Sequence, residues 1–258
     1  MFKDQISKPI IELRSISKSY GKLAVLKEVD LKIYQREVTC LLGHSGSGKT
    51  TLMRIASSLA RPDFGQVIKN GDPRFAYVFQ SPRLLPWQTA EENLLFVQKN
   101  YGLSKEKKLR DLLFEIADLA GFRKAFPAQL SGGMQQRLEL IRAFAVKPDL
   151  VFLDEPFKSL DLQTKFNLRQ LLDVIQQQSK TTLFLITHDP EAALLLADRI
   201  YFLAKEQGIT KEIVINIPRS SRKISSPQIS TYLEEIIDEF TDLVDQTNYQ
   251  LDNLKELF

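Results

Sequence analysis

The chain has 258 residues, of which 43% are hydrophobic and 26% charged, and its formal net charge is +3. This composition predicts a globular protein with one large α/β domain, or one domain that carries an insertion. No apolar run approaches the roughly 18 residues of a membrane helix, and the N-terminus lacks the apolar core of a secretory signal. The single cysteine, Cys40, excludes an internal disulfide. We therefore expect a protein of the reducing cytoplasm.

The charge is unevenly distributed. Residues 231–258 hold eight acids and one base, which leaves the preceding residues with 34 bases and 24 acids, a net charge of +10. A basic body can indicate nucleic-acid binding. Here the basic residues are scattered and form no stripe, so we expect no nucleic-acid partner.

The first third of the chain is rich in predicted strands. Alternating apolar residues predict strands with one exposed face, and a continuous apolar run is typical of a central buried strand. The alternating segments are residues 10–16, 24–26 and 29–33, and the continuous run is 38–42. The remaining elements of this part are a helix at 51–59, a turn at 61–65 and a strand at 75–79.

The middle of the chain has helical periodicity, and we expect residues 88–146 to be wholly helical. Thr89 and Glu92 predict a capping box at the start of this region. Strands are predicted again at 150–153, 182–186, 200–203 and 213–217, with a helix at 162–177. Parallel pairing of the apolar strands would give a sheet covered by helices on both sides. The pattern predicts an α/β fold with an inserted helical subdomain.

The acidic tail has apolar residues at helical spacing, which predicts an amphipathic helix. They are Leu233, Ile236, Ile237, Phe240, Leu243 and Val244. The simpler interpretation is that this helix packs on its own domain and turns an acidic face to water. The alternative is a segment that regulates the protein or supports a dimer.

Residues 43–50 match the phosphate-loop pattern G-x-x-x-x-G-K-[ST] between a predicted strand and a predicted helix. Glycines allow backbone N–H groups to face phosphates without a Cβ in the way. Lys49 would reach the β- and γ-phosphates, and Thr50 would bind Mg²⁺. The pattern predicts a nucleotide site.

Two acids, Asp154 and Glu155, follow the apolar run 150–153. A buried strand that ends in carboxylates places them at the sheet edge where ligands bind. Asp154 would hold Mg²⁺, and Glu155 would polarise the water that attacks the γ-phosphate.

A second phosphate-binding element is predicted at residues 130–137, Leu-Ser-Gly-Gly-Met-Gln-Gln-Arg. Ser131 and two glycines precede a helix-forming run, so the helix N-terminus would offer free N–H groups to an anion. The simplest use of two such elements is a dimer in which each nucleotide lies between one element from each subunit.

With these motifs in order over about residues 8–220, the chain closely resembles the ATP-binding subunits of ABC transporters. The resemblance implies a P-loop NTPase (RecA-like) core with an N-terminal antiparallel β subdomain and a helical subdomain at about 88–146. Residues 221–258 would then form the acidic helical tail. ATP and Mg²⁺ are the implied ligands.

The resemblance also implies roles for individual residues. Gln80 would touch Mg²⁺ and the water, His188 would contact the γ-phosphate, and Tyr20 would stack on adenine. Asp161 would belong to a loop that crosses between subunits, although Lys158 stands where the family has a small residue. The other nucleotide contacts would come from Gly43, His44, Ser45, Gly46, Ser47, Gly48, Lys49, Thr50 and Thr51, with no separate role for the His44 side chain. Across the dimer, contacts would come from Ser131, Gly132, Gly133 and Gln135.

Finer features resemble the ATPases of importers for nitrate, sulfonates, taurine, bicarbonate or thiamine-precursor pyrimidines. These features are residues 83–87, 154–157 and 217–222. The resemblance implies a peripheral protein on the cytoplasmic face of the membrane, where a second copy or a homologous ATPase subunit and a membrane permease are its partners. A substrate-binding protein outside would take part indirectly. An exporter subunit and a soluble, non-transport ABC ATPase remain alternatives.

Overall fold

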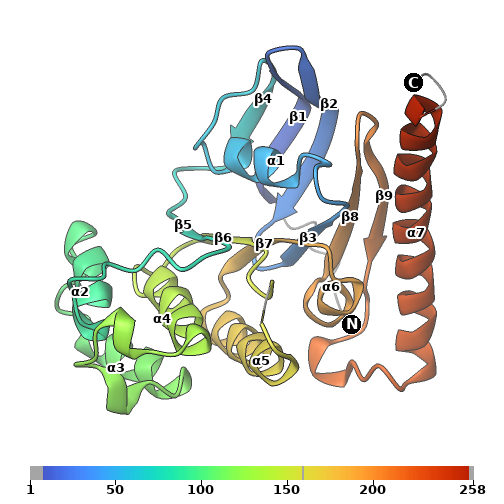
Figure 1. Ribbon diagram of the computed structural model, residues 1–258. Helices are drawn as coiled ribbons and strands as arrows, with labels where there is room; N and C mark the ends of the chain where they lie inside the picture. Colours follow the sequence, from blue (N-terminus) through green and yellow to red (C-terminus); the bar gives the residue numbers. More distant parts are fainter. Residues whose placement is uncertain (1–7, 159, 256–258) are drawn as a thin grey trace. The chain divides into compact units, whose positions relative to one another are not determined.

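The computed structural model describes residues 8–158 and 160–255, with side chains up to residue 243. The chain divides into two compact units, residues 1–72 with 184–258 and residues 73–183 (Figure 1). The predicted domain boundaries, 8–220 and 221–258, stay a prediction.

The first unit contains an antiparallel sheet of strand order β2-β1-β4. Its strands are β1 (Pro9–Tyr20), β2 (Leu23–Tyr34) and β4 (Phe64–Lys69). Residues 24–26 and 29–33 belong to one long strand rather than two, which contains Glu28 with a φ of 47°. β4 was not predicted, because the turn-like sequence at 61–65 hid its start and the strand is only partly buried.

The first unit also contains hydrogen-bonded strands of a second sheet, in the order β7-β3-β8-β9. The strands are β3 (Val38–Leu42), β7 (Thr182–Thr187, of which 184–187 belong to this unit), β8 (Arg199–Ala204) and β9 (Gly208–Val214). β3 and β8 are parallel, as expected, and both are almost fully buried. β9 is antiparallel to β8 because only three residues connect them. The predicted strand at 213–217 is therefore displaced: residues 215–217 lie beyond β9.

Three helices belong to the first unit: α1 (Lys49–Ala56), α6 (Pro190–Leu196) and α7 (Pro227–Lys255). A short 3₁₀ turn, η3 (Arg219–Ser221), precedes α7. α7 contacts α6 and β8 and runs alongside the β8–β9 hairpin (Figure 1). Its Ile229, Ile236 and Leu243 are buried, so the tail packs on its own unit, as the simpler interpretation expected. The side chain of Val244, which was expected to belong to the apolar face, is not among the described side chains. Residues 256–258 lie outside the described part of the tail.

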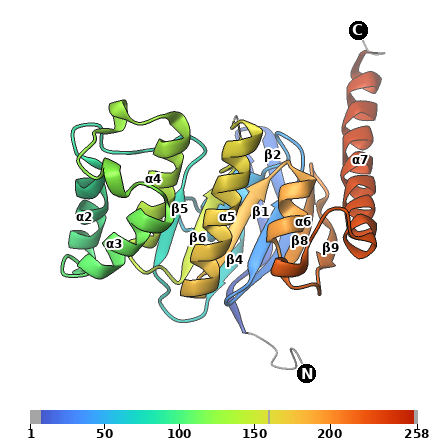
Figure 2. The same ribbon diagram turned by 90° about the horizontal axis from the view of Figure 1, so that it is seen from below.

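The second unit consists mainly of helices, which Figure 2 shows gathered around α4. The strands are β5 (Phe75–Val78) and β6 (Leu150–Asp154), which pair in parallel. The helices are α2 (Ala90–Asn100), α3 (Lys107–Ile116), α4 (Gly132–Phe144) and α5 (Leu162–Ser179), with 3₁₀ turns η1 (Ala120–Phe122) and η2 (Pro127–Gln129). Residues 88–146 contain helices and 3₁₀ turns but no strand, and loops separate the helices, so the expectation of a wholly helical region was only partly right. The predicted capping box of Thr89 and Glu92 is confirmed.

Candidate nucleotide site

The phosphate loop lies between the buried strand β3 and helix α1, in the first unit. Lys49 begins the helix, and its Nζ donates to the carbonyl oxygens of Gly43 at 2.7 Å and His44 at 2.8 Å. The Lys49 side chain therefore folds back over the loop, inside the curve where a phosphate would be held. The helix starts two residues before the predicted position and ends at Ala56 rather than residue 59.

Sterics explain the glycines of this loop. A Cβ on Gly43 would lie 2.5 Å from the carbonyl oxygen of Leu203, and Gly48 has a φ of 101°. A Cβ on Gly46 would meet nothing within 4 Å. Ser45 and Gly46 are exposed, and the buried hydroxyl of Ser47 has no hydrogen-bond partner among the described residues. The loop thus has open space on one side, which fits a phosphate cradle.

Three more predicted contact residues lie in the first unit. Tyr20 ends β1 and is 51% exposed, and Nζ of Lys18 lies over one face of its ring, 5.5 Å from the centroid. His188 follows β7 directly and is also exposed. Thr51 lies one turn into α1.

The predicted carboxylates end the buried strand β6, in the second unit. Asp154 is 7% exposed, and the Tyr77 hydroxyl lies 3.4 Å from its Oδ2. Glu155 is less buried and has a φ of 49°, in the left-handed region that non-glycine residues rarely adopt. Such outliers cluster at functional sites, and this one turns the chain sharply directly after the strand.

Gln80 is exposed and lies two residues beyond β5, which ends at Val78. The segment that follows is held by Asn93 of α2, which is fully buried. The Asn93 side chain accepts from the N–H of Leu85 at 2.8 Å and donates to the carbonyls of Leu85, Gln88 and Thr89 at 3.0–3.2 Å. Sequence reasoning missed Asn93, because an asparagine inside a helical pattern gives no sign of its partners.

A buried ion pair extends this network to α4. Arg142 donates to Glu139 at 2.5 Å and to Asn93 at 3.3 Å, and the backbone N–H of Arg83 donates to Glu139. Burial raises the pKa of Glu139, although Arg142 opposes the shift. Helix α4 and the segment after Gln80 are therefore joined by one hydrogen-bonded network.

The helix that follows residue 131 begins as predicted. Ser131 is the N-cap of α4, and its hydroxyl accepts from the N–H of Met134 at 3.3 Å. A Cβ on Gly133 would lie 2.8 Å from Cγ2 of Thr164, whereas a Cβ on Gly132 would meet nothing within 4 Å. A cavity of about 380 Å³ opens here, lined by Ser131, Gly132, Gly133, Met134, Arg137, Leu160, Asp161, Thr164 and Asn167.

Two predicted contact residues also have local structural roles. Gln135 donates to the carbonyls of Pro127 and Leu130 at 3.0 and 3.1 Å, which fixes the approach to α4. Asp161 is the N-cap of α5, where it accepts from the N–H and the hydroxyl of Thr164. The Thr164 hydroxyl holds the pKa of Asp161 below its usual value.

The donor chemistry fits Mg²⁺. Thr50 on α1, Asp154 at the end of β6 and Gln80 after β5 offer the oxygen ligands that this ion prefers. Among the residues that the structure describes, no group of three or more His, Cys, Asp or Glu side chains could hold a metal. Mg²⁺ in nucleotide sites usually uses one or two carboxylates together with substrate phosphates and water, so this finding is compatible with such a site.

Comparison with known proteins identifies the class. Residues 26–158 match the model of the ABC transporter family. The chain is 36% identical, over 93% of its length and 89% of the relative's, to an aliphatic sulfonates import ATP-binding protein, SsuB 2, of Burkholderia lata. The SsuB protein of Zymomonas mobilis is 38% identical over 81% of this chain and 88% of its own length. That of Corynebacterium glutamicum is 36% identical over 90% of this chain and 94% of its own length.

Solved structures agree with the sequence comparison. One is a dimeric post-hydrolysis state of an ATP-binding cassette bound to ADP and Pi, with a TM-score of 0.69, 29% identity and coverage of 81% of this chain and all of that one. Another is an ATP-binding subunit of an ABC transporter, with a TM-score of 0.74, 26% identity and coverage of 90% and 99%.

The chain therefore belongs to the ABC transporter family. It is an ATP-binding and ATP-hydrolysing subunit with the P-loop NTPase fold of that family. Within the described residues, we find no helix with the length and apolar character needed to cross a membrane.

Proposed function

We propose that this subunit powers an ABC importer for an aliphatic sulfonate or a similar small solute. It would work as a head-to-tail dimer on the cytoplasmic face of a membrane permease, supplied by a substrate-binding protein outside the membrane. The names of the sulfonate-import relatives favour this direction of transport and this class of solute.

The observation that carries the proposal is the presence of two phosphate-binding elements in one chain, the loop at 43–50 and the N-terminus of α4. In the proposed dimer, each ATP is bound by the loop of one subunit and by the Ser131 segment of the other. The open space at Gly132 supports this arrangement, since a Cβ placed there would meet no described atom within 4 Å apart from its chain neighbours and the adjacent backbone of α4. The dimeric nucleotide-bound neighbour supports it as well.

The proposed chemistry assigns one task to each side chain. Tyr20 stacks on the adenine, and Lys49 neutralises charge on the β- and γ-phosphates. Glu155 accepts a proton from the attacking water, while His188 and Gln80 hold the γ-phosphate and the water in place. Mg²⁺, held by Thr50, Asp154 and Gln80, would screen the phosphate charge.

Mixed dimers test the two-subunit site. Lys49→Ala subunits should lose nearly all ATPase activity, because this lysine neutralises charge on the phosphates. Ser131→Arg subunits should lose nearly all of it as well, because a residue acting across an interface in phosphoryl transfer can contribute about 10³–10⁵ in rate. When the two variants are mixed, one composite site carries both changes and the other carries neither. Nucleotide crosslinking should then find one normal site per mixed dimer. Crosslinking of the Ser131 segment to the phosphate bound by its own chain would overturn the head-to-tail arrangement.

Uptake tests the direction and the solute. A strain that lacks this subunit should lose uptake of labelled ethanesulfonate but keep uptake of sulfate, and the wild-type gene should restore the loss where Lys49→Ala does not. Unchanged uptake of the sulfonate would exclude this solute class, and accumulation of a compound in the deletion strain would indicate an exporter.

A further inference from the structure

The C-terminal helix contacts the phosphate loop within the first unit. The rings of His44 and Phe240 are stacked, with centroids 4.6 Å apart and planes inclined by 25°. The Nε2 of His44 also lies 3.5 Å from the carbonyl oxygen of Phe240. His44 occupies a variable position of the phosphate-loop pattern, so the pattern itself gives its side chain no task.

The backbone of His44 belongs to the phosphate-binding machinery. Its carbonyl oxygen accepts from Nζ of Lys49 at 2.8 Å and from the N–H of Ser47 at 3.2 Å. The contact with Phe240 therefore holds the same residue to which the catalytic lysine is hydrogen-bonded. A change in the position of His44 would move an acceptor of Lys49 as well.

Helix α7 is anchored without this contact. Ile236 and Leu243 are 0% and 4% exposed, one turn on either side of Phe240. Glu235 pairs with Lys211 of β9 at 3.0 Å, and Glu239 accepts from the hydroxyl of Thr210 at 3.0 Å. Because the helix has its own apolar and polar attachments, it provides a fixed support against which the His44 ring rests.

We propose that Phe240 is a positioning residue which, through His44, preorganises the phosphate loop for nucleotide. The inference rests on the proposed function, in that the loop at 43–50 binds ATP. A loop that is held in its bound conformation loses less conformational freedom on binding. The stacked pair should raise the affinity for MgATP about two- to tenfold, the range expected for one aromatic pair.

The coupling acts in both directions. If docking of α7 strengthens nucleotide binding, then nucleotide must strengthen the docking of α7 by the same factor. Any change that separates α7 from β9 would therefore weaken nucleotide binding.

Nucleotide affinity of the full-length subunit tests the inference. Calorimetry with MgATP should give a Kd about two- to tenfold higher for Phe240→Ala than for the wild type. Phe240→Tyr keeps the stacked ring and should restore the affinity. Ile237→Ala removes an exposed apolar side chain from the same helix and should leave the affinity unchanged. Phe240→Leu keeps the apolar packing without the ring, and it replaces the alanine variant if that variant unfolds.

A double-mutant cycle separates positioning from simple packing. In a His44→Ala background, Phe240→Ala should have no further effect on the Kd. Hydrogen exchange of α7 should slow on addition of MgATP in the wild type but not in His44→Ala. Equal effects of Phe240→Ala in both backgrounds, or no effect in the wild type, would overturn the inference while leaving ATP binding established. Failure of the wild-type subunit to bind MgATP would instead overturn the proposed function.

Discussion

At the scale of single residues, Gly132 and Gly133 are neighbours with different steric surroundings. A side chain at Gly133 would collide with Thr164 of its own chain, whereas the space beside Gly132 is open. A glycine that its own fold does not require is a candidate for close contact with a ligand, because the missing Cβ lets the backbone approach it.

We therefore expect Gly132→Ala to separate stability from activity. The substitution should raise the free energy of unfolding by up to about 1 kcal/mol, because alanine restricts the unfolded chain. ATPase activity should fall by about 10²-fold, as expected when a reacting group is displaced by about 1 Å. Thermal unfolding and phosphate release measure the two effects. Full activity in Gly132→Ala would show that no nucleotide approaches this residue, and Gly133→Ala, which should lose stability, is the matched comparison.

Glu155, with a φ of 49°, is a second residue at which the backbone conformation bears on the candidate site. We expect Glu155→Gln to keep MgATP binding and to stop hydrolysis, because the amide is nearly isosteric but cannot accept the proton from water. ATP that is bound and not hydrolysed should hold two subunits together. Light scattering with MgATP should therefore report a dimer for the variant, and a monomer at high concentration would contradict the proposed sandwich.

At the scale of secondary-structure elements, α2 and α4 are linked to the segment after Gln80 by buried polar groups. The Asn93 side chain contacts one N–H and three carbonyls of residues 85–89. The carbonyls of Leu85 and Thr89 also accept from the backbone N–H groups of Gln88 and Asn93. Arg142 and Glu139 extend the same network along α4. Since the Ser131 cap begins α4, the network joins the helix that follows Ser131 to the segment after Gln80.

Asn93→Ala should therefore lower the free energy of unfolding by about 1–3 kcal/mol, because it removes the side-chain partner of the Leu85 N–H and of the Gln88 carbonyl, both in partly buried residues. Thr89→Ala, which removes only a helix cap, should lower it by about 1 kcal/mol. Urea unfolding of both variants provides the comparison. If the two variants lose equal stability, the Asn93 network adds nothing beyond the cap.

The elements that could be predicted from the sequence are those that local patterns specify. The run at 38–42, the cap at Thr89 and the serine before α4 depend on residues close in sequence, and all three are confirmed. Orientation and distant partners could not be predicted in this way. The edge strand β4 pairs with β1, where Lys69 lies opposite Ile11, and Asn93 contacts Arg142, which is 49 residues away. The end of β9 and the contacts of Asn93 with residues 85–89 are local, but they depend on the exact conformation of a turn or loop. The stacking of His44 on Phe240 spans 196 residues, and no periodicity reports it.

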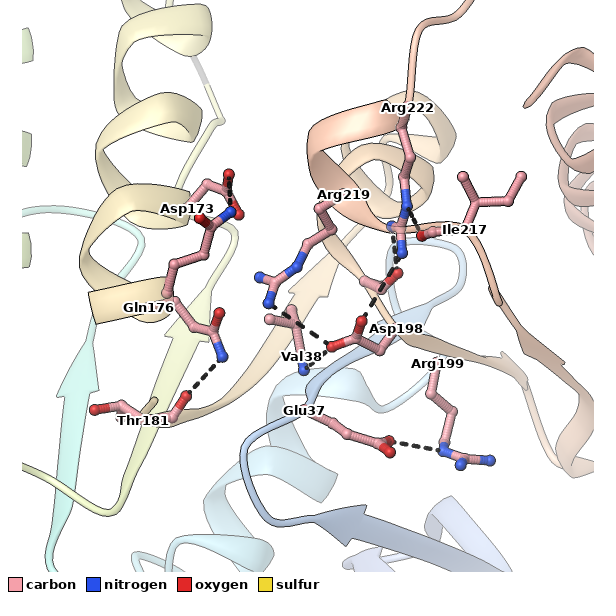
Figure 3. A network of polar contacts seen from close by, with 12 residues as sticks. Glu37, Val38, Asp173, Gln176, Thr181, Asp198, Arg199, Ile217, Arg219 and Arg222 are labelled. Carbon is pink, nitrogen blue, oxygen red and sulfur yellow. Dashed lines mark hydrogen bonds and ion pairs between the residues drawn. The ribbon is translucent and has the colours of Figure 1, made fainter. Parts of the chain in front are cut away.

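At the scale of the whole molecule, one arginine connects the end of the sheet to the tail. The Arg222 side chain donates to the carbonyls of Leu194, Ala197 and Ile217 at 2.6–2.9 Å (Figure 3). It also lies 3.8 Å from Asp198, which accepts from the N–H of Val38 at 2.9 Å. Residues 217–222, one of the features that resemble the importer subgroup, lie between β9 and α7, and Arg222 bonds this segment to Leu194, Ala197 and Asp198.

Substitution of Arg222 should strongly lower the free energy of unfolding. Arg222→Met should lower the free energy of unfolding by about 3–5 kcal/mol, because it removes one partner of a buried charged network. Arg222→Lys keeps the charge but lacks the planar fork that reaches several acceptors, so it should lose less than the methionine variant. Lys223→Met changes an exposed neighbour and should lie within about 0.5 kcal/mol of the wild type. Denaturant unfolding should rank Lys223→Met as the most stable variant, then Arg222→Lys, then Arg222→Met. An Arg222→Met protein as stable as Lys223→Met would show that the Arg222 network does not contribute to stability.

The burial of Cys40 has a practical consequence for observing the motions proposed here. It is the only cysteine of the chain, and it is 0% exposed in the centre of β3. A thiol in that position is shielded from maleimide reagents while the protein remains folded. A cysteine introduced at an exposed position, such as Ile237 on α7, can therefore carry a fluorophore or spin label without any cysteine-free background. The native chain is already suited to spectroscopy that follows the tail as nucleotide binds.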